Sequence, residues 1–301
     1  MPQKKSISVY RVNLVTVGIG QGQIETLPYL SNLTEYSPKG EILSQSNFTS
    51  NGLLAEKMAW DYDEKGQIIK QYYFAETDEP SETLTYERNE KGQVIREIKT
   101  YMDGSADTTT WEYDGEGQLL QKVTVDEDGV TELQEKFTWN GKQLLKHEIV
   151  DSEENIVFTD EFVYDDRGNM IEEKQVNQDT GDFRRKVSTF SKSNLKLSEK
   201  VYGEEGDLLE SVVYHYDKSG KLISSEFESP QKCSTTVYRY EEGGTQLGQE
   251  ETDEDGNQVL WVEHTYDEQK NRIRSTVFAN GGTLSSSQHY ELRYEYEWYE
   301  E

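Results

Sequence analysis

Aromatic and polar residues alternate in short segments that recur along most of the chain. Pairs of aromatic residues separated by one residue include Trp60/Tyr62, Trp111/Tyr113, Phe137/Trp139 and Tyr214/Tyr216. The residues between them are Asp61, Glu112, Thr138 and His215. Side chains two residues apart lie on the same face of a β-strand. The pattern therefore predicts strands with one aromatic face and one polar face that meets water.

The strand pattern is repeated with a fixed period. Glycine, or a residue in its place, recurs every 24 to 27 residues, at Gly40, Gly66, Gly92, Gly117, Gly141, Gly168, Asn194, Gly220, Gly244 and Lys270. A second kind of turn falls roughly midway between these positions, as at Gly52, Gly104, Gly129 and Gly256. A period of this length is typical of one supersecondary unit that is copied along the chain. The sequence predicts an all-β fold of tandem antiparallel β-hairpin repeats of about 26 residues.

The first kind of turn has the pattern aromatic-Asp-x-x-Gly. Aspartate at the start of a turn hydrogen-bonds backbone amides, and glycine adopts the left-handed conformation that closes the loop. Trp139-Asn140-Gly141 is shorter and predicts an Asn-Gly type I′ hairpin. We predict a structural role for the turn residues Asp63, Gly66, Asp114, Gly117, Asp165, Gly168, Asp217 and Gly220.

Two groups of apolar residues are candidates for the core. An aliphatic pair such as Ile68-Ile69 or Leu119-Leu120 follows each glycine, and we expect it to pack under the next hairpin. The aromatic rows are expected to fill a thin core, because only 33% of the residues are hydrophobic. The alternative is that the aromatic rows form an exposed platform for sugar rings or for side chains of a partner.

Residues 1–30 do not follow the repeat. The segment from Ser8 to Val17 is predicted to be a strand, and Gly18-Ile19-Gly20-Gln21-Gly22 its turn. We interpret residues 1–30 as an N-terminal cap over the first sheet edge or as a docking segment for a partner. Residues 31–301 then form the hairpin array, with about twenty strands in an elongated twisted sheet or a curled strip.

The repeat resembles the YD repeat of the RHS family. The resemblance rests on Tyr-Asp-x-x-Gly followed by one residue and two aliphatic residues, which occurs at Tyr62–Ile69, Tyr113–Leu120, Tyr164–Ile171 and Tyr216–Ile223. Membership would imply hairpins joined edge to edge in an RHS-like β strip that curls into a hollow shell. It would also imply a scaffold or binding role in bacterial secretion, toxin delivery or cell contact.

Charge narrows the classes of partner. The chain has 59 acidic and 31 basic residues and a net charge of −28. This field repels phosphate backbones and anionic lipids, so neither nucleic acid binding nor membrane insertion is expected. The single cysteine, Cys233, and the lack of a Sec-type apolar core at the N-terminus predict a cytoplasmic protein or one exported without a Sec signal.

No motif in the sequence indicates an enzyme, a metal site or a cofactor. The repeated aspartates have one turn-forming role, and the four histidines lie in separate units. We therefore predict a non-enzymatic scaffold that binds a protein, with glycans as a second ligand class. The alternatives are an immunity or antitoxin-like protein with an acidic surface, and a glycan-active enzyme that uses carboxylates on the sheet. The predicted binding residues are at the last strand: Tyr290, Tyr294, Tyr296, Trp298 and Tyr299.

Overall fold

The computed structural model describes residues 3–16, 23–281 and 287–300. Within these residues the chain forms 23 strands and no helix. The first twelve strands are β1 (Lys4–Thr16), β2 (Gln23–Glu25), β3 (Tyr29–Tyr36), β4 (Ile42–Phe48), β5 (Leu54–Tyr62), β6 (Ile68–Phe74), β7 (Glu82–Arg88), β8 (Val94–Tyr101), β9 (Ala106–Tyr113), β10 (Leu119–Val125), β11 (Thr131–Asn140) and β12 (Gln143–Val150). The others are β13 (Ile156–Tyr164), β14 (Met170–Asn177), β15 (Phe183–Phe190), β16 (Lys196–Tyr202), β17 (Leu208–Tyr216), β18 (Leu222–Glu228), β19 (Cys233–Tyr240), β20 (Gln246–Asp253), β21 (Gln258–Tyr266), β22 (Arg272–Ala279) and β23 (Gln288–Trp298).

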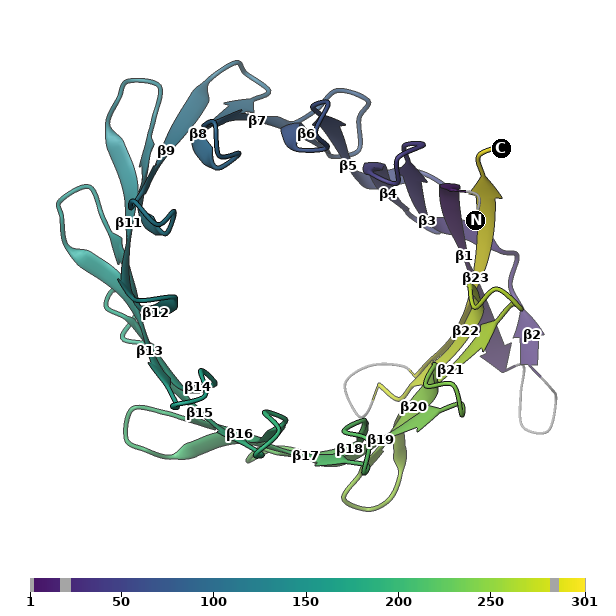
Figure 1. The fold of residues 1–301 in the computed structure, drawn as a ribbon. Helices are drawn as coiled ribbons and strands as arrows, with labels where there is room; N and C mark the ends of the chain where they lie inside the picture. The colour runs from purple at the N-terminus through teal and green to yellow at the C-terminus, as the bar shows by residue number, and fades with distance from the viewer. Residues whose placement is uncertain (1–2, 17–22, 282–286, 301) are drawn as a thin grey trace. The chain divides into compact units, whose positions relative to one another are not determined.

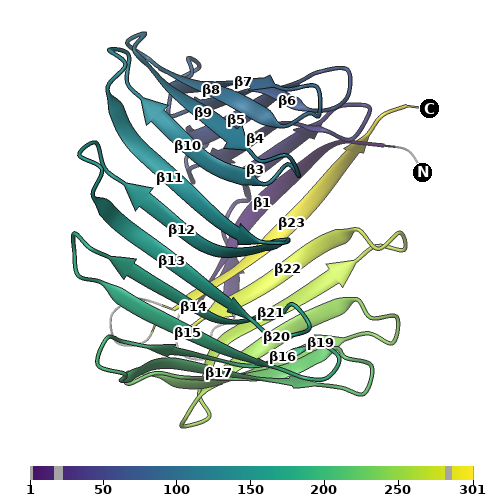
Figure 2. The same cartoon turned by 60° about the vertical axis from the view of Figure 1, so that its left-hand side comes forward.

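The chain divides into two compact units. Unit 1 comprises residues 1–85, 100–104 and 237–301, and unit 2 comprises residues 86–99 and 105–236. In unit 2, each of the strands β9 to β17 pairs antiparallel with the next one along the chain. Figure 2 shows β11 to β15 in this succession, each joined to the next by a short loop. The predicted all-β repeat of hairpins is confirmed.

A β-bulge follows every turn of the first kind for which the strand pairing is described. In the β5–β6 hairpin, Asp61 pairs with Lys70 and Tyr62 with Ile68, so Ile69 has no cross-strand partner. Leu43, Leu120, Leu145, Ile171, Leu197, Ile223 and Ile273 occupy the same bulge position.

The bulge corrects the expected role of the aliphatic pairs. Ile68 and Leu119, the first residues of two such pairs, are half-buried. Ile69 and Leu120, the second residues, are 38% and 40% exposed. For these two pairs the expectation that both residues pack under the next hairpin is wrong, because the extra residue of a bulge changes the direction in which side chains point, whereas Leu144 and Leu145 are both half-buried.

The prediction of an open, elongated sheet or a strip with two free ends is also wrong. Strand β1 pairs antiparallel with β3, from Ser6↔Glu35 to Arg11↔Tyr29. It also pairs with β23, from Lys4↔Trp298 to Asn13↔Tyr290. Figure 1 shows β1 between β3 and β23 within unit 1. An edge strand leaves a row of backbone N–H and C=O groups unpaired, and this pairing satisfies them on both sides of β1.

Few large side chains are fully buried. Among the described residues, the buried hydrophobic side chains are those of Val12, Val150 and Val201. Small polar residues are buried beside larger neighbours: Ser275 is 2% exposed and its hydroxyl oxygen lies 2.9 Å from His264 Nδ1 and 3.5 Å from the Tyr294 hydroxyl oxygen. The aromatic residues of the repeat are mostly half-buried, so they shield small residues between them instead of forming a closed core.

Left-handed backbone conformations occur mainly at the predicted turn positions. Asn194 and Lys270 have φ of 62° and 65° and occupy the glycine position of their turns. In the turn at 151–155 the left-handed residue is Glu154, with φ of 66°. The loop between β11 and β12 is Gly141–Lys142, and only Gly141 has positive φ, which fits a type II′ turn and corrects the predicted type I′ turn. The turn expected at Gly18–Gly22 lies outside the described residues.

Candidate functional site

The turn aspartate holds its loop through backbone hydrogen bonds. One oxygen of Asp165, Oδ1, accepts the N–H groups of Arg167 and Asn169, both at 2.9 Å, and Gly168 N–H donates to the Asp165 carbonyl. Asp63, Asp114 and Asp217 accept the equivalent pairs of backbone N–H groups. The side-chain hydrogen bond from Asn169 is the main reason why the pKa of Asp165 lies well below its usual range.

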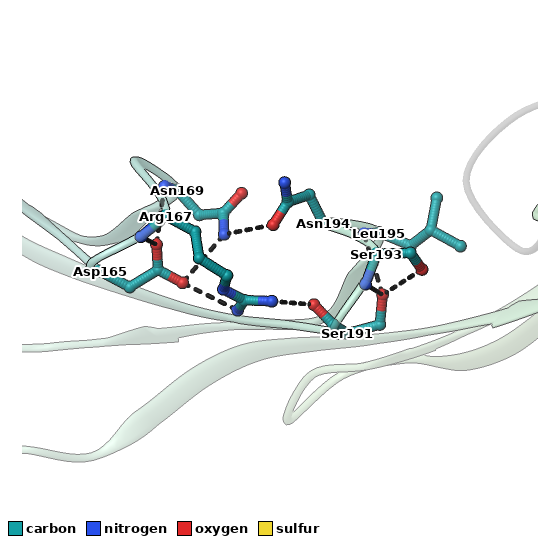
Figure 3. A network of polar contacts seen from close by, with 7 residues as sticks. All are labelled: Asp165, Arg167, Asn169, Ser191, Ser193, Asn194 and Leu195. Carbon is teal, nitrogen blue, oxygen red and sulfur yellow. Dashed lines mark hydrogen bonds and ion pairs between the residues drawn. The ribbon is translucent and has the colours of Figure 1, made fainter.

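Neighbouring turns of the first kind contact one another. Arg167 donates from Nη1 to the carbonyl of Ser191 at 2.5 Å, and Asn169 donates from Nδ2 to Oδ1 of Asn194 at 3.0 Å (Figure 3). Gln93 makes a similar link, from Nε2 to the carbonyl of Gly117 at 2.9 Å. These bonds join turns that are about one repeat apart.

The tyrosine before each turn aspartate joins its unit to the preceding one. Tyr164 donates its hydroxyl to the carbonyl of Leu144 at 3.0 Å, and Trp139 donates its indole N–H to the carbonyl of Leu119 at 2.7 Å. The same bond runs from Tyr62 to Ile42, Tyr113 to Val94, Tyr216 to Lys196 and Tyr266 to Gln246. Burial raises the pKa of Tyr164. The aromatic-Asp-x-x-Gly motif thus fixes both the turn and the spacing of the hairpins.

The two kinds of turn differ in charge over most of unit 2; the exception among the second kind is Ser229–Lys232, which has one lysine and no carboxylate. Four consecutive turns of the second kind, which we call the acidic turns, are Asp126–Gly129, Asp151–Glu154, Asn177–Asp182 and Gly203–Gly206. They contain ten carboxylates and no lysine or arginine. The six turns of the first kind in unit 2 contain six carboxylates and five lysine or arginine residues. Because successive hairpin turns lie at opposite ends of an antiparallel sheet, one end of this sheet is strongly acidic and the other is nearly neutral.

A groove lies beside two of the acidic turns. It has a volume of about 350 Å³. Leu209 is the bulge residue of the β16–β17 hairpin, since Val201 pairs with Glu210 and Tyr202 with Leu208, and its side chain is 36% exposed. Arg184 and Glu210 form an ion pair at 3.0 Å. The groove is lined by Phe158, Gln175, Asn177, Asp182, Phe183, Arg184, Leu209 and Glu210. We call these eight residues the unit 2 groove.

Three strands of unit 2 bring together a histidine and two carboxylates. His147 on β12 lies 3.0 Å from Glu135 Oε2 on β11 through Nε2 and 3.3 Å from Asp160 Oδ2 on β13 through Nδ1. Its ring stacks on Phe137 with centroids 4.7 Å apart. Asp160 is 9% exposed, and its second oxygen has no hydrogen-bond partner. The two carboxylates therefore hold the imidazole ring between them.

The sequence did not reveal this cluster, because its members are 12 and 13 residues apart in sequence and are unremarkable by type. The only usable signal is that Asp160 stands two residues from Phe158 and Phe162, on the aromatic face of its strand, where most repeats place an uncharged residue. A charged residue on a shielded face requires a partner.

The five aromatic residues predicted as a binding surface have different surroundings. Tyr296 donates to the carbonyl of Arg272 at 2.7 Å, and Tyr299 donates to the carbonyl of Tyr36 at 2.6 Å. The guanidinium of Arg11 lies 3.8 Å from the ring centroid of Tyr290, and the Tyr294 hydroxyl lies near Ser275. Trp298 is 38% exposed and stacks on Tyr296. Strand β23 pairs with β1 along Tyr290–Trp298 and with β22 along Gln288–Arg293, so at least one of its edges is occupied throughout and a terminal edge is less open to a partner than expected.

The described part of the chain lacks two further features. No group of three or more His, Cys, Asp or Glu side chains in residues 3–16, 23–281 and 287–300 is arranged to hold a metal ion. No helix long and apolar enough to cross a membrane is present in the same residues.

Comparisons with known proteins identify no family. No protein-family model matches the chain, and no curated protein matches it. A chain of the TcdB2-TccC3-Cdc42 crystal structure matches with a TM-score of 0.34 and 10% identity over 97% of this chain and 21% of that one. A porin-like protein from Bacteroides uniformis matches with a TM-score of 0.34 and 12% identity over 98% of both chains. The chain spans about a fifth of the first of these structures. Likenesses this weak do not identify a function.

Proposed function

We propose that this chain is a non-enzymatic scaffold that binds a protein partner through the acidic end of unit 2. The observation that carries the proposal is the excess of carboxylates in the acidic turns. The loop geometry needs only the first aspartate: Asp126 Oδ1 accepts the N–H groups of Asp128 and Val130. Glu127 and Asp128 add charge that the turn does not use and that repels its neighbours, so loop stability does not explain them. Attraction of a basic protein surface explains these two carboxylates.

The same surface supports a second candidate, an immunity or antitoxin-like protein that covers a basic partner. The two candidates share the acidic turns and differ in the identity of the partner. A setting in bacterial secretion, toxin delivery or cell contact follows from the YD-repeat resemblance alone and stays part of the proposal, as does a cytoplasmic location or export without a Sec signal. The five aromatic residues of the last strand are kept as a second proposed contact surface.

The glycan-active alternative needs two carboxylates that face a substrate from opposite sides. Glu135 and Asp160 are two carboxylates on one part of the sheet, but both contact His147, whose ring lies between them. This favours a structural role for the pair and supports the non-enzymatic proposal.

Photo-crosslinking tests the proposed function. A photoreactive amino acid is placed at Glu127 or Glu204 in the acidic turns, and at Lys192 in a turn of the first kind as the control. We expect one protein to be captured from both acidic positions and not from Lys192, and its purified form to bind more weakly as ionic strength rises. Hydrolysis of an oligosaccharide by the purified chain, with no protein captured, would contradict the proposal.

A further inference from the structure

We infer that the unit 2 groove is an anchor site for one large apolar side chain of a basic protein segment. The inference rests on the proposed function, and it adds where the partner binds and what chemistry the partner must have. It does not follow from charge alone, because four acidic turns could attract any cation. The groove is what selects one kind of segment.

Three of the eight residues that line the groove are apolar. Phe158, Phe183 and Leu209 contribute to it from β13, β15 and β17. Its volume of about 350 Å³ is at the lower end of the range of roughly 300–1,000 Å³ that is usual for ligand pockets. A space of this size suits a single aromatic or long aliphatic side chain. Such anchors supply most of the energy at protein interfaces.

Leu209 is a partly exposed bulge residue, like Leu120 and Leu197 at the opposite end of the sheet, but it alone of these three lines the unit 2 groove. A bulge redirects a side chain, and here it leaves a leucine 36% exposed beside an acidic turn. The hairpin β10–β11 has Glu132 at the equivalent bulge position, since Thr124 pairs with Leu133 and Val125 with Thr131. The hairpin geometry therefore accepts a charged residue at this position as well as apolar ones such as Val157 and Val259. An apolar contact with a partner accounts for a leucine at the groove.

Charge decides what surrounds the anchor side chain in the partner. Arg184 is the one lysine or arginine among the lining residues, and its guanidinium is paired with Glu210 at 3.0 Å. Asp182 lies at one side of the groove, and Glu204 and Glu205 lie in the adjoining acidic turn, all three exposed. Lysine or arginine residues on both sides of the apolar anchor complement this arrangement.

A glycan is the other ligand class that an aromatic groove suits, but the observations favour the peptide. Sugar binding uses exposed aromatic faces for stacking, whereas Phe158 and Phe183 are half-buried. The free charges at the groove are carboxylates, which bind cationic groups more strongly than neutral hydroxyls. Binding of a glycan in place of the peptide would show the opposite preference.

The test uses the full chain and a defined probe. The probe is a labelled peptide with a central tryptophan flanked on each side by two lysines, and binding is followed by fluorescence anisotropy at low ionic strength. Matched peptides carry glycine in place of tryptophan or glutamate in place of lysine. The protein variants are Leu209→Ala and the control Leu197→Ala, which changes a bulge leucine of similar exposure, 39%, at the opposite end of the sheet. A double variant, Glu204→Gln with Glu205→Gln, removes two charges from an acidic turn. Its control is a second double variant, Glu116→Gln with Asp166→Asn, which removes two charges from turns of the first kind.

We expect Leu209→Ala to weaken binding of the tryptophan peptide about tenfold, while Leu197→Ala leaves it unchanged. The Glu204→Gln, Glu205→Gln variant should weaken binding and its control should not. Equal effects of the two leucine variants, or equal binding of the glycine peptide, would overturn the anchor site. So would an oligosaccharide whose binding depends on Leu209 when the peptide does not bind. If the crosslinked partner binds Leu209→Ala as well as the unchanged chain, the anchor inference fails while the proposed function stands.

Discussion

The hydroxyl group of Tyr164 donates a hydrogen bond of 3.0 Å to the backbone carbonyl of Leu144, 20 residues earlier in the chain. The carbonyl belongs to the strand that follows the preceding turn of the first kind, so the bond joins two hairpins. The same bond recurs in both units, from Tyr62 to Ile42 and from Tyr216 to Lys196. Its recurrence explains why tyrosine, and not phenylalanine, precedes the turn aspartate.

Removal of this bond should destabilise the array. We expect Tyr164→Phe to lower the free energy of unfolding by about 0.5–1.5 kcal/mol, because the Leu144 carbonyl loses its side-chain donor. Urea denaturation followed by circular dichroism measures the change. The control is Tyr202→Phe, since the Tyr202 hydroxyl makes no hydrogen bond to the described residues. Equal losses in the two variants would show that the bond adds nothing.

Two glycines of one turn should respond differently to alanine. Gly117 has φ of +88°, and a Cβ there would lie 3.1 Å from Nε2 of Gln93. We expect Gly117→Ala to cost about 1–3 kcal/mol through left-handed strain. Gly115 does not have positive φ and has open space around it, so Gly115→Ala should be neutral or slightly stabilising. Thermal unfolding midpoints of the two variants compare them directly, and a larger loss at Gly115 would contradict the turn geometry.

Acid should weaken the fold through the turn aspartates. The pKa of Asp165 is lowered in the folded chain, chiefly by the hydrogen bond from Asn169, and the unfolded value is about 3.9. The unfolded state therefore binds protons first as pH falls. The contribution to stability is complete above about pH 4 and decreases below it.

The Asp165→Asn variant tests whether the turn aspartate lowers stability as the pH falls. It keeps an acceptor oxygen for the turn but cannot titrate, so its denaturation midpoint should fall less between pH 6 and pH 2 than that of the unchanged chain. Asp166→Asn removes the same charge from the same turn and is the control. The prediction fails if the two variants have the same acid dependence.

The His147 cluster should contribute more to stability than an exposed histidine does. His147→Ala leaves Glu135 and Asp160 close together with no group between them, and we expect a loss of about 2–4 kcal/mol. His215→Ala removes a histidine that is 44% exposed and pairs only with Glu226, so its loss should be under about 1 kcal/mol. Urea denaturation of both variants measures the difference. Equal losses of unfolding free energy in the two variants would show that the His147 cluster does not stabilise the fold.

The aromatic residues of the last strand should support pairing with β1. Tyr296 pairs with Ile7 and Trp298 with Lys4, and the Lys4 ammonium lies 4.9 Å from the Tyr296 ring centroid. We expect Tyr296→Ala with Trp298→Ala to speed amide hydrogen exchange in residues 4–13 while leaving partner binding at the acidic turns unchanged. If partner binding falls and exchange does not change, these residues form a binding surface instead.

The sequence by itself determined the repeat, the strands and most of the turns. Asp165 and Gly168 could be placed from type and spacing because the bonds that fix them span only five residues. The turn after Asp151 differs: asparagine enters the left-handed region more readily than glutamate, yet Glu154 and not Asn155 has positive φ, because Glu154 N–H donates to the Asp151 carbonyl as glycine does in the other turns. Local chemistry thus decided the hairpins.

Only the tertiary structure determined that β1 pairs with both β3 and β23, and where charged and apolar surfaces lie side by side. The pairing of Lys4 with Trp298 joins residues from the two ends of the chain, and no local pattern specifies it. The contact between His147 and Asp160, and the presence of Phe158 and Leu209 in one groove, depend on strand register. Register is set by the sum of many cross-strand contacts and by bulges that shift the pairing by one residue, so it becomes fixed only when the strands pack together.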